Sequence, residues 1–221
     1  MLEFALVAFL FIPVLMGSFV TGMNLIRSIQ VNEVCRDLAD IYIHGGDFST
    51  YSMQQLAQRL ATGLGLQIGS SFTGNSNSNT GNSGNGLITV TQMEYVGPTT
   101  GSLCTSVGAG NCVNHDSYVY LERIQFGNST LASATTVTLG TPTTGITISS
   151  AGVVQNPLTD SHAKIPDPAQ TSMVNMWSDS NNGTAALVDG QVVYIVETYF
   201  QSPDLALGSL SGQGVYARYF F

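Results

Sequence analysis

The sequence predicts an α+β protein, with a long N-terminal helix and a short second helix followed by an antiparallel β-sheet head domain. Three observations support this. The start is almost entirely apolar, the next stretch has helical periodicity, and the later chain carries strand-like runs between turn-forming segments. No strand–helix–strand alternation occurs, so we do not expect a doubly wound nucleotide-binding fold. We place the N-terminal helix in residues 1–46 and the head domain in residues 47–221.

The run from Phe4 to Met23 contains no charged side chain. A helix of this length spans roughly 30 Å, the hydrocarbon thickness of a bilayer, and so predicts a transmembrane helix. The run lacks the basic start and short apolar region of a cleavable signal, so we expect the chain to keep it. Pro13 removes one helix hydrogen bond, which allows a kink or local melting.

Glu3 is an acid at the start of this apolar run. An ionised carboxylate is strongly disfavoured in apolar surroundings unless it is paired. The nearest basic side chain in sequence, Arg27, is about 36 Å away along a continuous helix. Charge alone leaves two interpretations open: Glu3 pairs with a free α-amino group of this chain or a neighbour, or it is solvated at the bilayer interface.

The helix continues beyond the run with one apolar face, and its apolar positions recur at spacings of three and four residues: Val31, Val34, Leu38 and Ile41. The motif HGGD, with Gly45 or Gly46 in a left-handed conformation, predicts the helix end. These signals predict one helix of about 40 residues whose second half packs on a globular domain.

A second helix is predicted in STYSMQQLAQRLATGLG, which starts at an N-cap chosen among Ser49, Thr50 and Ser52 and stops at Gly63 or Gly65. Its expected apolar stripe consists of Met53, Leu56, Leu60 and Leu64.

The sequence after the second predicted helix predicts a β-sheet. Residues 70–86 are low-complexity and polar, and we expect a flexible exposed loop. The predicted strands are Leu87–Val96, Tyr118–Phe126, Thr135–Leu139, Ile146–Ser149, Gln191–Gln201 and Gly214–Phe221. The last two are expected to form an antiparallel hairpin with a long loop. Residues 156–180 contain three prolines and predict a surface excursion, with a short helix near 169–177.

The composition excludes one class of partner. Charged residues make up 9% of the chain and the net charge is -8. A nucleic-acid-binding protein needs a basic stripe, and none occurs here. A polar but nearly uncharged surface is typical of secreted or surface-exposed proteins.

Three cysteines occur. Cys104 and Cys112 flank a glycine-rich loop, and in an oxidising compartment we expect them to form a local disulfide; two free thiols are the alternative. Cys35 lies in the first helix and is expected to be a buried small apolar residue, with an intermolecular bridge as the alternative.

Sequence motifs for chemistry are lacking. His44 is expected to cap a helix end. His115 and Asp116 are not expected to form a catalytic dyad, because neighbouring residues on an extended chain point to opposite faces, and we interpret them as part of a loop of turn-forming residues. Residues 178–183 match only the beginning of a calcium loop, and the Asn128 and Asn182 glycosylation sequons are weak signals. We therefore expect no enzyme activity, no cofactor and no metal site.

The segments EFALVAFLFIPVLMG, RSIQVNEVCRDLADIYIHGGDFS and LAQRLATGLGL resemble the TadE/TadG-like proteins of the tight-adherence (Flp, or Tad) pilus system, within the type IV pilin superfamily. The resemblance is strongest over about the first 66 residues. GNCVN and YLERIQFGN are similar more loosely.

The resemblance implies a long N-terminal helix with a β-rich head, a basic leader cleaved by prepilin peptidase, and insertion in the inner membrane. The pilus assembly machinery would then extract the chain into an extracellular filament on the bacterial cell surface, a homopolymer whose core is the bundled apolar helices. Glu3 matches the family's acid, which pairs with the N-terminal amine of a neighbouring subunit, and Phe4 matches the apolar position after it. The assembly residues expected on this basis are Glu3, Phe4 and Pro13.

Three functions remain open. The chain is a structural subunit of such a filament, a minor pseudopilin at the tip or in the assembly apparatus, or a membrane-tethered enzyme or surface adhesin. The length of the chain favours the minor role mildly, because major Flp pilins are much shorter. The third function needs convergent polar side chains on the head, and the sequence displays no such cluster.

Overall fold

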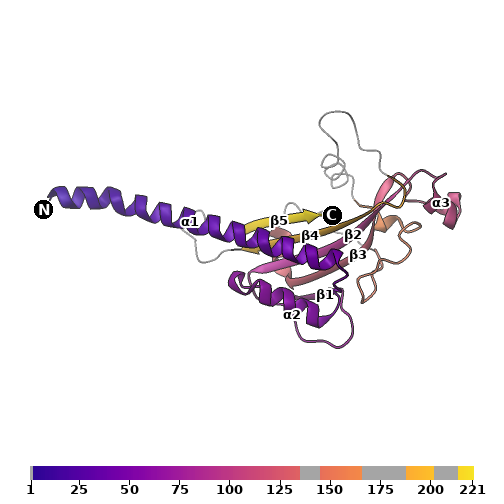
Figure 1. The fold of residues 1–221 in the computed structure, drawn as a ribbon, viewed down its shortest axis with the longest axis horizontal. Helices are drawn as coiled ribbons and strands as arrows, with labels where there is room; N and C mark the ends of the chain where they lie inside the picture. Colours follow the sequence, from indigo (N-terminus) through magenta and orange to yellow (C-terminus); the bar gives the residue numbers. More distant parts are fainter. Residues whose placement is uncertain (1, 135–144, 166–187, 202–213) are drawn as a thin grey trace.

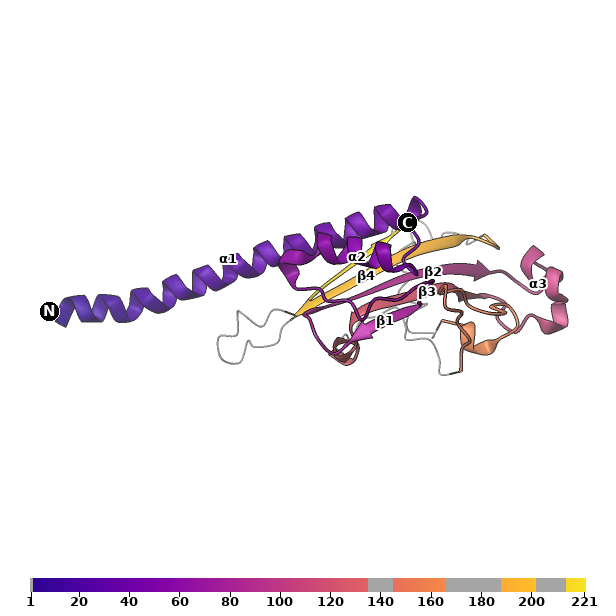
Figure 2. The same cartoon turned by 90° about the horizontal axis from the view of Figure 1, so that it is seen from below.

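The computed structural model describes residues 2–134, 145–165, 188–201 and 214–221, with the backbone alone described in 2–8 and 133–134. It confirms the α+β fold: a long N-terminal helix, a short second helix and a sheet (Figure 1). The long helix projects beyond the sheet as a rod. Its N-terminus and the short helix α3 (Ser102–Val107) lie at opposite ends of the molecule (Figures 1 and 2).

Helix α1 (Leu2–Ile43) runs for 42 residues and ends where the HGGD motif predicts. Gly45 adopts φ +88°, a left-handed conformation that glycine enters without a Cβ clash. The N–H of Gly45 donates to Tyr42 O at 3.0 Å, and the N–H of Gly46 donates to Ile41 O at 2.9 Å. This pair of bonds is a Schellman motif, which satisfies carbonyls that a helix end leaves open.

The described chain forms one five-stranded sheet, with strands β1 (Ser78–Gly81), β2 (Gly86–Val96), β3 (Ser117–Asn128), β4 (Val192–Gln201) and β5 (Gly214–Phe220). The order across the sheet is β1-β3-β2-β4-β5, and all neighbours are antiparallel except β1 and β3. Strands β4 and β5 pair as the predicted hairpin, with Val196 opposite Tyr219. The predictions for β2, β3, β4 and β5 are therefore confirmed.

One face of this sheet packs against α1 and α2 (Tyr51–Leu60). The second half of α1 contributes a buried stripe to this core: Val31, Val34, Cys35, Leu38, Ala39 and Tyr42. The sheet contributes buried residues from four strands: Ile88, Val90, Ile124, Phe126, Val196, Phe200 and Ala217. The amphipathic pattern predicted this contact, although Ile41 is only partly buried.

The opposite face of the sheet carries a second core. Residues 145–165 cover it, with Val154, Ala163 and Ile165 packed over buried side chains of the sheet. A bulge at Gln92/Met93 shifts the β2–β3 register there. Figure 2 shows the helices on one side of the sheet and these loops on the other.

Helix α2 begins after Thr50, one of the three predicted N-caps, but its buried face differs from the predicted stripe. The buried residues of α2 are Gln54 and Ala57, whereas Leu56 and Leu60 are exposed. The other two predicted positions do reach the core, because Leu64 is buried in it and Met53 packs against it partly buried. Ala57 and Ala61 belong to the core on this face of the sheet. The amide of Gln54 is satisfied there, because its Nε2 donates to Phe48 O at 2.9 Å and its Oε1 accepts from Asn79 Nδ2 at 2.8 Å.

Short 3₁₀ segments complete the described elements: η1 (Thr62–Leu64), η2 (Ala109–Asn111), η3 (Ser129–Ala134) and η4 (Ser161–Ala163). Gly65 follows η1 with φ +72°, so one of the two predicted stop glycines has the expected conformation.

The predicted loop at 70–86 was wrong in part, and the predicted strand at 146–149 was wrong. Within the polar segment 70–86, Ser78–Gly81 forms strand β1, because its backbone pairs with β3 and Asn79 is buried against Gln54. Residues 146–149 form no strand. They make a single bridge, Ile148 with Val154, because the chain turns back at Gly152. The predicted strand at 135–139 and helix at 169–177 lie outside the described residues.

Candidate functional site

The first candidate site is the exposed half of α1. Its large apolar side chains face solvent along the whole rod: Phe9, Leu10, Phe11, Ile12, Val14, Leu15, Met16, Phe19, Leu25, Ile26 and Ile29. Phe9 is 83% exposed. The helix is long and apolar enough to cross a membrane, and its most apolar window is not buried against the rest of the described chain. Removing each such side chain from water stabilises by about 1.5–3 kcal/mol, so this surface has a strong tendency to be covered.

The predicted assembly residues lie along this rod. The backbone at Glu3 and Phe4 is helical, but their side chains are outside the described part of the chain. Pro13 is exposed, and α1 continues through it as a helix. Further along, Ser18 Oγ donates to Leu15 O at 2.9 Å. A hydroxyl bonded to its own helix needs no other partner in an apolar environment.

The rod is fixed to the head by a polar contact as well as by the apolar core. Tyr42 Oη donates to Glu122 Oε2 at 2.9 Å, and the Tyr42 ring packs edge-on against Phe48 and Tyr194. Burial, followed by the Glu122 carboxylate, raises the pKa of Tyr42 far above its ordinary value. Burial also raises the pKa of Glu122, while the Tyr42 hydrogen bond opposes that rise. Tyr42 therefore remains a neutral hydrogen-bond donor at physiological pH.

Cys35 is buried in the same interface, as predicted. Its thiol lies 3.3 Å from Val196 O, and burial raises the pKa of the thiol to about 11. A thiol reacts through its thiolate, so Cys35 is unreactive in the folded chain, and the alternative of an intermolecular bridge does not fit its burial.

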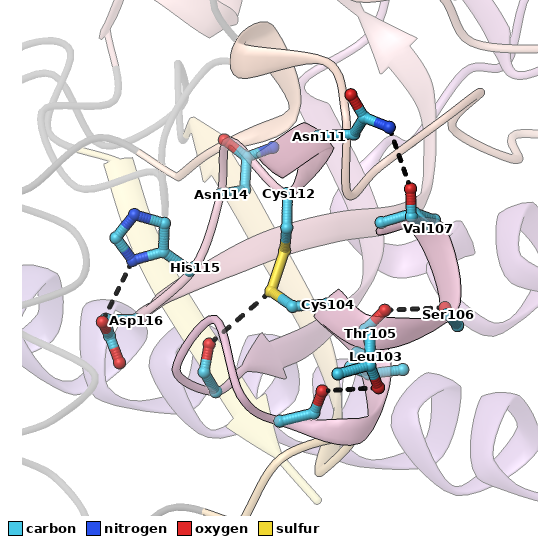
Figure 3. Close-up of a disulfide and its surroundings, with 12 residues drawn as sticks. Leu103, Cys104, Thr105, Ser106, Val107, Asn111, Cys112, Asn114, His115 and Asp116 are labelled. Atoms are coloured by element: carbon cyan, nitrogen blue, oxygen red, sulfur yellow. Dashed lines mark hydrogen bonds and ion pairs between the residues drawn. A yellow bond between two sulfur atoms is a disulfide. The ribbon is translucent and has the colours of Figure 1, made fainter. Parts of the chain in front are cut away.

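The second candidate site is the disulfide loop at the end of the molecule farthest from the N-terminus. Cys104 in α3 is bonded to Cys112, with a Cα–Cα distance of 5.1 Å (Figure 3). This confirms the predicted pairing. The loop that it closes lies beside β2 and β3, where both half-cystines pack with Val96 and Val119 in a small buried cluster.

Asp189 holds this loop to the sheet, a role that the sequence did not predict. Its carboxylate accepts hydrogen bonds from Gly97 N at 2.7 Å, Ser102 Oγ at 2.9 Å and Leu103 N at 3.1 Å. Partial burial acts to raise the pKa of Asp189, but these hydrogen bonds outweigh it, and the pKa lies below its ordinary value. Asp189 is far from the loop in sequence and lies outside any motif, so only the fold identifies it.

Two of the histidines, His44 and His115, contact their own chain neighbours in ways that fit a structural role. His44 Nδ1 lies 2.7 Å from Asp40 O at the end of α1, as predicted for a helix cap. His115 Nδ1 lies 3.1 Å from Asp116 Oδ2, although we expected these side chains to diverge (Figure 3). They meet because Asp116 adopts φ 52°, which turns the chain, and the pair is exposed. Among the described residues, no group of three His, Cys, Asp or Glu side chains could hold a metal ion.

The Asn128 sequon is not available for glycosylation in the folded chain. Asn128 is 7% exposed, and its Nδ2, the atom that would carry a glycan, donates to Gly84 O at 2.7 Å. Its Oδ1 accepts from Thr130 N at 3.0 Å. The Asn182 sequon and the partial calcium loop at 178–183 lie outside the described residues.

An ion pair on the sheet, between a buried carboxylate and a partly buried guanidinium, was missed by sequence reasoning. Glu197 is 5% exposed and lies 3.4 Å from Arg218 Nε, and both interact with the hydroxyl of Tyr216. The three residues belong to the neighbouring strands β4 and β5. A charged residue inside each of two otherwise apolar strands was the available signal.

No protein-family model, no curated protein and no solved structure matches this chain. The fold and sites define its class on their own. It is an α+β protein with an N-terminal helix of membrane-spanning length and a disulfide-bonded head.

Proposed function

We propose that the chain is a structural subunit of an extracellular type IV pilus-like filament of the Tad type, assembled through bundled N-terminal helices. One observation carries the proposal: a single helix is exposed and apolar over its first half and embedded in the head over its second half. This division supports a subunit that moves from the inner membrane into a filament, because both environments would cover the apolar half. The resemblance of the first residues to TadE/TadG-like proteins supports the same function.

In this proposal the chain lies in the inner membrane before assembly. Prepilin peptidase and the pilus assembly machinery process and extract it, and copies of the chain surround the rod afterwards. Glu3 pairs with the N-terminal amine of a neighbouring subunit. Transfer from lipid to protein gains little from the hydrophobic effect, because lipid tails are as apolar as the rod, so packing and the export machinery drive assembly.

The test is microscopy and N-terminal sequencing of filaments sheared from cells that express the chain. We expect filaments that contain this chain as the main component. Glu3→Ala should reduce filament yield while the near-ultraviolet circular dichroism of the head stays unchanged. Asp40→Ala, which removes an exposed acid from the embedded half of the helix, is the matched control and should leave yield unchanged.

Normal filament yield from Glu3→Ala would refute the pairing role. Finding the chain at low copy number in filaments of another pilin would replace the main proposal with the minor-pseudopilin function. Absence of the chain from any sheared filament, together with ligand binding by its head, would support a membrane-tethered adhesin.

A further inference from the structure

The face of the sheet that carries α1 is longer than the helix that covers it. Strands β2 and β4 run on past the end of α1 towards α3 (Figures 1 and 2). The opposite face of these strand ends is closed, because Met93 and Val193 are fully buried there in the second core. On the α1 side, the neighbouring residues Gln92, Val192 and Tyr194 are only partly buried. The fold therefore leaves this part of the α1 face uncovered.

Five residues form this uncovered surface, which we call the shelf. Three of them make a row across the sheet, because Gln92 pairs with Glu122 of β3 on one side and with Tyr194 of β4 on the other. Phe221 extends the row, since it exchanges two backbone hydrogen bonds of 3.0 Å with Tyr194. Glu94 lies two residues beyond Gln92 on β2 and therefore on the same face.

Most polar side-chain atoms that the shelf leaves open are hydrogen-bond acceptors. Glu94 makes no hydrogen bond or ion pair with any residue that the structure describes. Gln92 Nε2 donates to Tyr194 Oη at 3.3 Å, so the amide oxygen of Gln92 faces outward as an acceptor. Glu122 accepts from Tyr42 Oη through Oε2, and its Oε1 can accept a further bond. Apart from the Tyr194 hydroxyl, the shelf thus calls for a ligand that donates.

The shelf is also negatively charged and aromatic. Burial, followed by the Asp189 carboxylate, raises the pKa of Glu94. Burial raises the pKa of Glu122 as well, and Asp47 adds to this rise. Within the described part of the chain, neither carboxylate has a basic partner that would offset these effects. Phe221 is 46% exposed beside them, and acids next to an open aromatic ring attract a cation.

We propose that the shelf binds a basic segment of a partner protein through an arginine side chain. A guanidinium group carries five N–H donors, no acceptor and a permanent charge, and its flat face stacks on aromatic rings. In the complex, the Glu94 carboxylate pairs with the guanidinium, and the rings of Tyr194 and Phe221 contact the rest of the side chain. A sugar fits this surface less well, because its hydroxyl groups need donors as well as acceptors.

The partner is a different protein and not a second copy of the chain. Each copy carries 14 acidic and 6 basic residues, so two copies repel each other. The inference does not depend on the filament proposal, because a major subunit, a minor pseudopilin and a tethered adhesin would all present the same shelf.

The two carboxylates determine the design of a test peptide. Glu94 lies two residues further along the sheet than the row that contains Glu122, which corresponds to about 7 Å. Side chains two residues apart in an extended peptide have the same spacing and face the same side. The probe is therefore acetyl-Arg-Gly-Arg-amide. Its control peptide has citrulline in place of both arginines, which keeps the shape and removes the charge. Methyl α-glucoside is the probe for sugar binding.

Binding is measured from the NMR shifts of the β2 and β4 backbone amides, with the full chain in micelles of an uncharged detergent. We expect the arginine peptide to bind about tenfold more tightly than the citrulline peptide. Glu94→Gln and Phe221→Leu should each weaken the binding of the arginine peptide by about threefold to fivefold. Glu33→Gln, which removes an exposed acid from α1, is the charge-matched control and should leave binding unchanged. The amide spectrum also checks that each variant keeps its fold.

Equal binding of the two peptides would overturn the proposal. The same loss with Glu33→Gln as with Glu94→Gln would also overturn it, because only a general attraction of an acidic chain for cations would remain. A chain that binds methyl α-glucoside and not the arginine peptide would have a sugar site here instead. Full binding by both Glu94→Gln and Phe221→Leu would place the peptide elsewhere and refute the shelf assignment.

Discussion

Replacing Leu38 by alanine tests whether the second half of α1 is part of the core of the head. Leu38 is fully buried in the cluster that contains Val196 and Ala217 of the sheet. Truncating a buried leucine loses its transfer free energy and leaves a cavity, which together cost about 2–5 kcal/mol. We expect the free energy of unfolding of the head to fall by an amount in this range.

Leu25→Ala is the matched control, because it makes the same chemical change on the same helix at a side chain that is 64% exposed. Its expected effect is within about 0.5 kcal/mol. Thermal unfolding of the full chain in detergent micelles, followed by near-ultraviolet circular dichroism, separates the two variants. A domain of this size loses about 2–4 °C in Tm per kcal/mol, so Leu38→Ala should lower the Tm by roughly 4–20 °C. Equal, small shifts for both variants would show that α1 is only a tether.

Three further changes are tested in the same unfolding assay. Asp189→Asn should lower the Tm at neutral pH, and the Tm difference from the unchanged chain should shrink as the pH falls through the lowered pKa of Asp189. The reason is that an acid with a depressed folded-state pKa stabilises the fold above its unfolded-state pKa and loses that effect when it is protonated. A Tm difference that is independent of pH would contradict this. Replacing both Cys104 and Cys112 by serine should cost about 2–3 kcal/mol and abolish any effect of reductant on the Tm, and a reductant effect that persists would contradict the assignment. Gln54→Ala should cost about 1–3 kcal/mol because it leaves the buried amide of Asn79 without its acceptor, whereas a neutral result would mean that water replaces it.

The elements that the sequence predicted well are those with strong local signals. The helix end at Gly45 follows from the conformational freedom of glycine, and the stripe Val31, Val34 and Leu38 follows from helical periodicity. The disulfide pair was predictable because its two cysteines are close in sequence and flank a glycine-rich segment that can turn back on itself. In each case the information lies within a few residues.

The elements that were missed depend on contacts between distant segments. Strand β1 has a polar sequence and exists because its backbone pairs with β3, and because Asn79 meets Gln54. Asp189 and the Glu197–Arg218 pair likewise gain their roles only when the sheet brings separate segments together. In α2, Gln54 is buried in the core and Leu56 is exposed, because the fold supplies hydrogen-bond partners for the Gln54 amide.

The Leu38 and Tyr42 contacts decide at which residue a truncated, water-soluble form of the head should begin. A piece that started at Asp47 would strip the cover from one side of the sheet, exposing Ile88, Val196 and Phe200, and would leave Glu122 without its tyrosine. Cutting just before Val31 instead removes the rod and keeps every side chain that α1 buries against the sheet. Binding studies on the head should therefore use the longer piece, because the shorter one would bind other molecules nonspecifically through core side chains that α1 normally covers.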